Sequence, residues 1–183
     1  MIFTETKLRG AYIIDIEKIQ DARGFFARVW CQKDFEERGL NPRIVQVNLA
    51  FNKKRGTLRG MHFQHAPHQE CKLVQCTRGA ILDVIIDLRR NSPTHRQWIG
   101  VELRPGTHRM LFVPEDFAHG YQTLEDNTEV MYQVSQLYAP KSEGGVRYND
   151  PAFGIQWPLE ATVISDKDKA WPDYAAHEAK TVS

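Results

Sequence analysis

The chain has 183 residues, a length typical of one domain or at most two small ones. Its 42% hydrophobic and 26% charged residues exclude a disordered or collagen-like chain, and 24 basic against 23 acidic residues exclude the basic excess of a general nucleic-acid binder. The most apolar run, residues 80–88, is interrupted by Asp83 and Asp87, which excludes a membrane span there.

Hydrophobicity with a period of two dominates the chain and predicts a series of short strands. Over residues 45–51, apolar side chains alternate with Gln46 and Asn48, which predicts a strand with one apolar and one partly polar face. A short helix, Lys33–Arg38, is predicted to end at Gly39. The other predicted strands are Tyr12–Ile16, Phe25–Trp30, Thr57–Gln64, Lys72–Cys76, Ile81–Leu88, Trp98–Leu103, Met110–Val113 and Val130–Val134. Many short strands separated by turn residues favour an all-β sandwich or barrel.

The segment from about residue 150 has little periodicity and is punctuated by prolines after Asp150, Trp157 and Trp171. It is predicted to be ordered coil lying over the sheet, with a second short helix that begins near Ser165. Because no internal repeat or flexible linker separates this segment from the rest, a single domain over residues 1–183 is expected.

The cysteines and the N-terminus bear on the compartment. Cys31, Cys71 and Cys76 are odd in number and form no CxxC pair, which predicts free thiols in a reducing environment. The first ten residues, MIFTETKLRG, lack the apolar core of a signal peptide. Both features predict a cytoplasmic protein.

Reactive side chains gather in strand-like sequence. Residues 57–74 contain Arg59, His62 and Lys72, and a further histidine, His119, is predicted to lie in a loop. Each has an ordinary structural interpretation when taken alone, and Lys72 would then be a charge that protects an edge strand. A strand-rich core has little reason to hold an arginine, a histidine and a lysine close together, so their joint appearance favours a site.

The C-terminal half adds candidates with similar alternatives. Tyr132, between Val130 and Val134, would ordinarily be a packed aromatic residue. Ser165 and Asp168 would ordinarily satisfy the free backbone N–H groups at a helix start.

Metal and nucleophile chemistry have weaker sequence support. His62 and His65 are three residues apart, so in an extended strand their rings point to opposite sides, and no His-x-His pair occurs. His68 and His119 are further candidate ligands, but the spacing disfavours a metal site. A Gly-x-Ser-x-Gly nucleophile motif and a glycine-rich phosphate loop are both absent, so arginines would have to bind any phosphate.

A set of ordered motifs links the chain to a known family. The motifs are Asp21-Ala-Arg-Gly-Phe-Phe26, Gln46-Val-Asn48, Gly56-Thr-Leu-Arg-Gly-Met-His-Phe-Gln64, Lys72-Leu-Val74, Asp83 to Arg89 with Ser92-Pro-Thr94, Pro114 to Gly120, Tyr132, Tyr138, Asn149-Asp-Pro151, Trp157-Pro158 and Ser165-Asp-Lys-Asp168. With these motifs, residues 1–172 resemble the dTDP-4-dehydrorhamnose 3,5-epimerase family. The resemblance implies an all-β, cupin-type antiparallel jelly-roll barrel with a few short helices and neither a metal nor another cofactor.

The resemblance also implies an activity and its residues. It implies an isomerase of deoxysugar, rhamnose and polysaccharide biosynthesis that inverts C3 and C5 of a nucleotide-linked 4-keto-6-deoxyhexose, with dTDP as the expected nucleotide. It also implies a homodimer with shared strands. His62 would be the base, Asp168 its partner, Tyr132 the proton donor on the other face, and Lys72 the group at the ketone. The implied nucleotide and phosphate contacts are Arg23, Gln46, Asn48, Arg59, His119, Tyr138, Glu143 and Lys167.

One position departs from the family pattern. Two residues after Phe26 the family typically has a glutamate that contacts thymine, and this chain has Arg28. A hydrogen-bond acceptor is thus replaced by a donor with a fixed positive charge. The nucleotide base and the exact sugar are therefore left open.

The residue types suit proton transfer beside a ketone. A neutral imidazole accepts a proton near neutral pH, and a carboxylate partner orients it. An ammonium stabilises the enolate oxygen, and inversion requires a separate acid on the opposite face. In a regular strand Arg59 and His62 would face opposite ways, unless Gly60 hosts a bulge. The alternatives are an epimerase at C3 or C5 alone, a metal-dependent cupin oxygenase or isomerase, and a non-enzymatic sugar-binding module.

Overall fold

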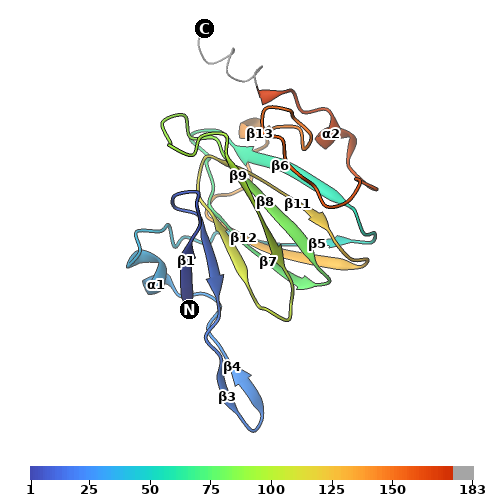
Figure 1. Cartoon of the computed structure of the whole chain (residues 1–183). Helices are drawn as coiled ribbons and strands as arrows, with labels where there is room; N and C mark the ends of the chain where they lie inside the picture. Colours follow the sequence, from blue (N-terminus) through green and yellow to red (C-terminus); the bar gives the residue numbers. More distant parts are fainter. Residues whose placement is uncertain (175–183) are drawn as a thin grey trace.

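Two antiparallel β-sheets form the body of the molecule (Figure 1). The computed structural model describes residues 1–174. In spatial order, the larger sheet contains β1 (Ile2–Glu5), β2 (Tyr12–Asp15), β10 (Met110–Val113), β7 (Lys72–Arg78), β12 (Thr128–Val134) and β5 (Gln46–Asn52). The smaller sheet contains β13 (Glu143–Gly145), β6 (Leu58–Gln64), β11 (Phe117–Thr123), β8 (Ile81–Asp87) and β9 (Trp98–Leu103). This arrangement confirms the predicted cupin-type jelly roll.

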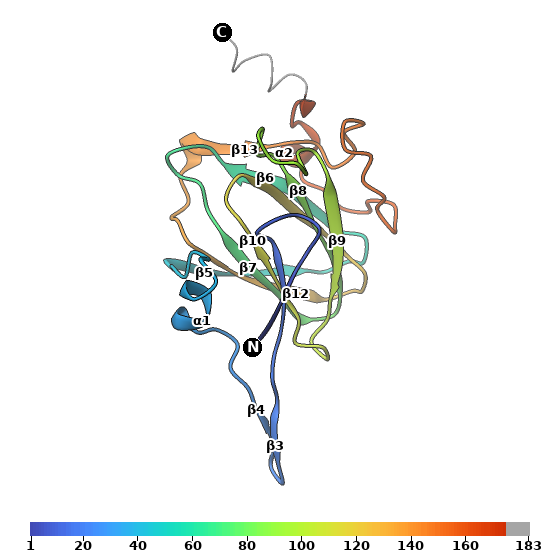
Figure 2. The ribbon, with the colours of Figure 1, turned by 60° about the vertical axis from the view of Figure 1, so that its left-hand side comes forward.

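The remaining elements lie outside the barrel. They are the hairpin strands β3 (Ile19–Asp21) and β4 (Gly24–Phe26), the helices α1 (Gln32–Glu36) and α2 (Asp166–Lys169), and the 3-10 helix η1 (Pro140–Ser142). The β3–β4 hairpin projects away from the body (Figure 2). The predicted strand Phe25–Trp30 is wrong beyond Phe26, because β4 pairs only with the three residues of β3. No helix within residues 1–174 has the length and apolar character needed to cross a membrane.

The core between the sheets explains most of the strand pattern. Val74 and Val130 from the larger sheet pack with Ile85 and Phe117 from the smaller one, and all four are almost fully buried. The loop predicted around His119 is wrong, because this residue lies on the central strand β11, where every residue is buried. A strand buried on both faces has no polar alternation, and a pattern of period two cannot reveal it.

The edge strand β5 shows which of its faces is turned inwards. Gln46 and Asn48 line the interior cavity, whereas Val47 is 56% exposed and Leu49 is 64% exposed on the outer face. The apolar face predicted for residues 45–51 therefore points away from the barrel. A row of exposed apolar residues on an edge strand is typical of an interaction surface.

A bulge in β6 resolves the conflict between Arg59 and His62. His62 pairs with His119 and Arg59 pairs with Tyr121, so β6 has one more residue than β11 between these pairs. Gly60 lies in this bulge with a φ of 124°, and a Cβ there would be 2.5 Å from the Cα of Gly120. The extra residue turns Arg59 and His62 to the same side, where both line the cavity.

The three cysteines are free, as predicted. Burial is the main cause that raises the pKa of Cys71 to about 12 and the pKa of Cys76 to about 11. Both side chains are therefore protonated thiols at neutral pH and not nucleophilic thiolates.

A buried carboxylate stabilises the turn after β8. Asp87 accepts hydrogen bonds from the side chains of Arg89, Ser92 and Thr94 at 2.6–2.9 Å. Burial alone would raise the pKa of Asp87, but these hydrogen bonds outweigh it and lower the pKa to about 2. Because the folded pKa lies below the unfolded value, the stabilisation is complete above about pH 4 and is lost as the pH falls through about 2.

Replacement of Asp87 by asparagine is therefore expected to lower the free energy of unfolding at pH 7 by about 2 kcal/mol. The difference from the wild type should shrink as the pH is lowered from about 4 towards 2. Urea unfolding across this pH range measures it, with Asp166→Asn, which neutralises a fully exposed carboxylate, as the control. A constant difference at every pH would contradict the assignment.

Candidate active site

A cavity of about 580 Å³ opens between the two sheets. Its wall holds all the sequence-predicted site residues except Arg23. They are Gln46, Asn48, Arg59, His62, Lys72, His119, Tyr132, Tyr138, Glu143, Lys167 and Asp168. These side chains come from both sheets, from the segment after β12 and from α2, so the fold gathers residues that are far apart in the sequence.

His62 and Asp168 form a close pair at one wall of this cavity. The imidazole Nε2 lies 2.7 Å from Asp168 Oδ1, and the backbone N–H of Gly60 donates to the other carboxylate oxygen. Burial would raise the pKa of Asp168, but these hydrogen bonds outweigh it and lower the pKa. The ionised carboxylate accepts a hydrogen bond from the Nε2–H group and leaves Nδ1 of His62 as the basic nitrogen.

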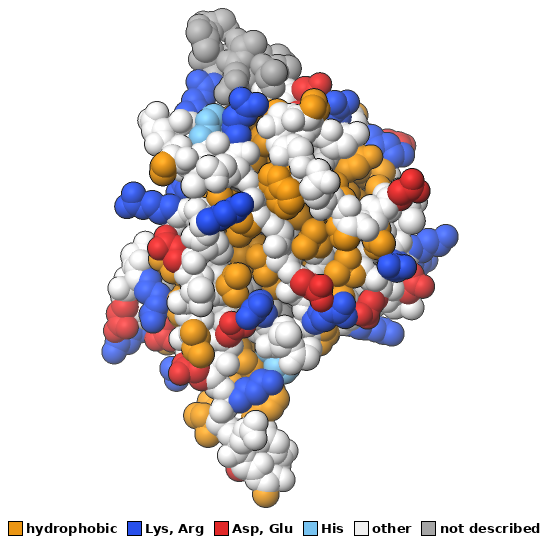
Figure 3. Space-filling model, in the orientation of Figure 1, with side chains coloured by type: hydrophobic (Ala, Val, Ile, Leu, Met, Phe, Trp, Pro, Cys, Tyr) orange, Lys and Arg blue, Asp and Glu red, His pale blue; other side chains and the backbone are white. Residues whose placement is uncertain are grey.

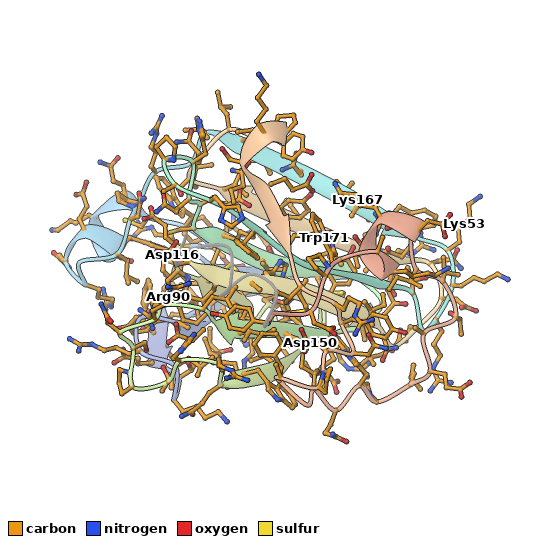
Figure 4. The ribbon with its side chains drawn as sticks, turned by 90° about the horizontal axis from the view of Figure 1, so that it is seen from above. Lys53, Arg90, Asp116, Asp150, Lys167 and Trp171 are labelled. Atoms are coloured by element: carbon orange, nitrogen blue, oxygen red, sulfur yellow. The ribbon has the colours of Figure 1, made fainter. Side chains whose placement is uncertain are left out.

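The local sequence of α2 places Asp168. The Ser165 hydroxyl accepts a hydrogen bond from the backbone N–H of Asp168 and thereby caps the helix. The capping interpretation of Ser165 is confirmed, whereas the Asp168 side chain turns away from the helix towards His62. Figure 4 labels Lys167, which belongs to α2, and Trp171, which follows this helix. The Trp171 ring lies edge-on to His62 at 6.3 Å between centroids.

Lys72 lies inside the barrel, on the central strand β7. β10 and β12 flank this strand, so the interpretation of Lys72 as an edge-strand charge is wrong. Its side chain is 9% exposed, and Nζ lies 3.2 Å from Glu70 Oε1 and 3.5 Å from the carbonyl oxygen of His62. The ammonium is thus close to the strand that carries His62.

Tyr132 comes from the larger sheet and His62 from the smaller one, with the cavity between them. Burial, followed by the charge of Glu70, raises the pKa of the Tyr132 phenol, and Arg59 opposes this shift. At neutral pH the phenol is therefore protonated and able to donate. The arrangement supplies a base on one wall of the cavity and an acid on the other.

Two polar or cationic groups of the cavity wall are held by buried partners. Arg59 donates through Nε to Asn52 Oδ1 at 2.8 Å, which leaves its terminal nitrogens available. Nε2 of His119 lies 2.7 Å from Asp83 Oδ1. Groups of this kind bind anionic oxygen atoms such as those of a phosphate.

The mouth of the cavity is polar. Glu143 accepts hydrogen bonds from the Tyr138 hydroxyl at 2.9 Å and from Lys167 Nζ at 2.5 Å. Burial would raise the pKa of Glu143, but these two partners lower it, and Glu143 in turn raises the pKa of Lys167. Gln46 donates to Asn48 at 2.8 Å on the adjoining wall.

Comparison with known proteins agrees with this geometry. The model of the dTDP-4-dehydrorhamnose 3,5-epimerase family matches residues 5–176. The chain belongs to this family.

Individual epimerases are similar over nearly their full length. The dTDP-4-dehydrorhamnose 3,5-epimerase of Methanothermobacter thermautotrophicus is 44% identical over 92% of this chain and 92% of its own. The crystal structure of the enzyme from Elizabethkingia anophelis has a TM-score of 0.94 at 36% identity and covers 96% of this chain and 97% of that one. The Legionella pneumophila enzyme, solved in complex with dTDP-4-keto-L-rhamnose, has a TM-score of 0.89 at 35% identity, with 98% of this chain and 95% of that one covered.

Arg23 is the one residue predicted for an epimerase site that the fold does not bring to the cavity. It lies at the tip of the β3–β4 hairpin, pairs with Asp21, and has a side chain that is 89% exposed. Arg28, which replaces the typical glutamate of the family, is also exposed and does not line the cavity. Within one chain, both residues are separate from the epimerase site.

Four residues at the epimerase site were not predicted from the sequence. Glu70 and Tyr121 line the cavity, and Asn52 and Asp83 hold Arg59 and His119. Asn52 continues the inward alternation of Gln46 and Asn48, and Asp83 is a charge within an otherwise apolar strand. The sequence pattern could therefore have indicated both residues. Glu70 precedes β7 and Tyr121 lies on β11, which was not predicted, so no pattern in the sequence indicated either residue. Within residues 1–174, no group of three or more His, Cys, Asp or Glu side chains is placed to hold a metal ion.

Proposed function

We propose that this chain inverts C3 and C5 of a dTDP-linked 4-keto-6-deoxyhexose by removing and returning the protons beside the ketone. The observation that carries the proposal is the placement of the His62–Asp168 pair and Tyr132 on opposite walls of one cavity, with the Lys72 ammonium also at its wall. Membership of the epimerase family and the dTDP-sugar bound to the Legionella relative support it.

The reaction begins at a carbon next to the ketone. His62 removes its proton, the electrons of the C–H bond form a C=C bond to C4, and the π electrons of the C4 carbonyl move to its oxygen to give the enolate. Lys72 stabilises this negative charge, an effect often worth about 3–4 kcal/mol. Asp168 stabilises the imidazolium that forms.

Inversion is completed from the other face. The Tyr132 hydroxyl gives its proton to the carbon, and the C=C electrons form the new C–H bond as the ketone returns. Solvent then restores the proton of Tyr132 and removes that of His62. The same sequence at the second carbon gives the doubly inverted sugar.

The nucleotide part of the substrate supplies binding energy away from the reacting carbons. Arg59, His119 and Lys167 bind the diphosphate, and Gln46 and Asn48 bind the nucleoside in this proposal. Remote contacts of this kind hold the sugar in position for both proton transfers.

The proposal includes a homodimer that supplies Arg23 to the partner subunit's cavity. The β3–β4 hairpin projects from the barrel with Ile19 and Phe26 exposed, and hydrophobic side chains appear on this lower projection in Figure 3. The outer face of β5 adds exposed Leu49. A second copy covers these apolar surfaces in the proposal, and the free cysteines support a cytoplasmic location.

Leu49→Glu is expected to convert the dimer into a monomer, because it places a charge on an apolar surface that the partner covers in the proposal. Size-exclusion chromatography with light scattering measures the mass of each variant. Ile2→Glu, on the opposite edge of the same sheet, is the matched control and should leave the dimer intact. A wild-type monomer, or a dimeric Leu49→Glu protein, would overturn the dimer proposal.

Solvent deuterium exchange tests the activity. The enzyme is incubated in D₂O with dTDP-, GDP- and CDP-linked 4-keto-6-deoxy sugars, and NMR reads deuterium at C3 and at C5. We expect incorporation at both carbons of the dTDP sugar. Incorporation at one carbon would identify an epimerase of that carbon alone. Faster exchange with the GDP or CDP sugar would show that the chain prefers another nucleotide base, as the replacement of the family's glutamate by Arg28 allows.

Two further outcomes would exclude the proposed chemistry. Binding of every sugar nucleotide without any exchange would identify a sugar-binding module. Loss of exchange after treatment with a chelator, followed by recovery with iron, manganese or zinc, would identify a metal-dependent cupin.

A further inference from the structure

Glu70 is a partly buried carboxylate of the cavity to which the proposed reaction assigns no role. It lies just before β7, two residues from Lys72, and its side chain is 13% exposed. It lines the same cavity as His62 and Tyr132. A carboxylate this well buried requires a partner, and its partner here is a residue of the reaction.

The contacts of Glu70 fix both of its oxygens. Oε1 lies 3.2 Å from Lys72 Nζ, and Oε2 accepts a hydrogen bond from Gln64 Nε2 at 3.3 Å. Gln64 also donates to the carbonyl oxygen of His68 and accepts from the backbone N–H of Ala139 at 2.7 Å. Because Gln64 belongs to β6, the carboxylate is anchored to the strand that carries the catalytic base.

Lys72 has few other groups to direct it. The carbonyl oxygen of His62 lies at 3.5 Å, a distance too long for a strong hydrogen bond. A lysine side chain is flexible and its ammonium is a compact charge, so an unpaired ammonium would not keep a fixed position. The ion pair with Glu70 therefore fixes the position of the Lys72 ammonium, which the other groups of the cavity wall do not do.

We propose that Glu70 is a positioning residue of the epimerase reaction, whose carboxylate holds the Lys72 ammonium where negative charge develops on the ketone oxygen. This inference rests on the proposed function. It assigns to Glu70 an action through Lys72 and no contact with the reacting carbons.

The same carboxylate also acts on the proton donor. Tyr132 lies on β12, next to β7, and faces Glu70 as well as Arg59 from β6. Burial is the largest cause of the raised pKa of Tyr132, the charge of Glu70 adds to it, and Arg59 opposes it. Glu70 therefore favours the protonated phenol that inversion requires.

Glu70→Gln tests the inference, because it keeps the shape and the hydrogen-bonding oxygen but removes the charge. We expect kcat for epimerisation to fall by about tenfold to a hundredfold, with a smaller change in KM. The basic limb of the pH–rate profile should move to lower pH, because the Tyr132 phenol loses a neighbouring negative charge. Labelled tyrosine NMR should show the same displacement in the titration of Tyr132.

Two control variants and a measurement of folding make the result specific. Glu70→Asp keeps the charge and should keep the basic limb and the Tyr132 titration of the wild type. Glu37→Gln makes the same change in an exposed ion pair with Lys33 and should change nothing. Thermal unfolding of each variant verifies that it is folded, and if Glu70→Gln does not fold, Glu70→Ser carries the same titration test.

Wild-type kcat and an unmoved pH profile in Glu70→Gln would overturn the inference. Lower kcat with an unmoved basic limb and Tyr132 titration would overturn the effect of Glu70 on Tyr132 and support an action through Lys72 alone. A wild-type enzyme without proton exchange would instead refute the proposed function, and the two failures are thus distinguishable.

Discussion

His62→Ala is expected to lower deuterium incorporation at both C3 and C5 by about a thousandfold or more, since one base removes the proton from each carbon. The Nδ1 atom of His62 is left basic because Asp168 holds the opposite nitrogen. Lys72 and the phosphate-binding groups stay in place in this variant, so binding of dTDP should change little. NMR in D₂O and calorimetric titration with dTDP measure the two effects separately.

His65→Ala is the matched control for this result. His65 follows β6 directly, is exposed, and does not line the cavity, so its loss should leave exchange unchanged. Retention of full exchange by His62→Ala would show that another group is the base. Loss of exchange at only one carbon would show that a second base serves the other.

Local sequence pattern was sufficient to predict much of the active site. Arg59, His62 and Lys72 stand out because they are charged or polar within strands whose neighbours are apolar. Asp168 had an ordinary interpretation at a helix start, and only the family resemblance implied its place beside His62. Their assembly in one cavity follows from the jelly roll, which the family resemblance implied and periodicity alone did not.

The features that the sequence left open or that were missed depend on contacts between distant segments. The sequence offered a bulge at Gly60 as one of two alternatives, and the pairing of β6 with β11 decides for it. The strand β11 itself was missed, because its two buried faces remove any alternation. The outward direction of Leu49 depends on which face of β5 meets the cavity, and period two does not distinguish the faces. Glu70 acquires its role only because Gln64 and Lys72 converge on it.

Tyr132→Phe is expected to separate proton removal from inversion. The ring and its packing remain, but the proton donor of the second face is lost. The rate of formation of epimerised product should therefore fall by about a hundredfold or more. His62 still removes the proton and, after exchange with solvent, returns a deuteron to the same face. Deuterium should therefore appear at C3 and C5 of sugar whose configuration is unchanged.

The pH dependence of the wild type gives the same residue a second test. Because the pKa of Tyr132 is raised, chiefly by burial, the phenol stays protonated to higher pH than an exposed tyrosine. Inversion should decline only as the pH rises through this raised pKa, and proton exchange in Tyr132→Phe should lack that decline. Tyr12→Phe, on β2 and outside the cavity, is the control. Full inversion by Tyr132→Phe would assign the proton donor to another group, and loss of exchange together with inversion would show that Tyr132 positions the substrate for His62.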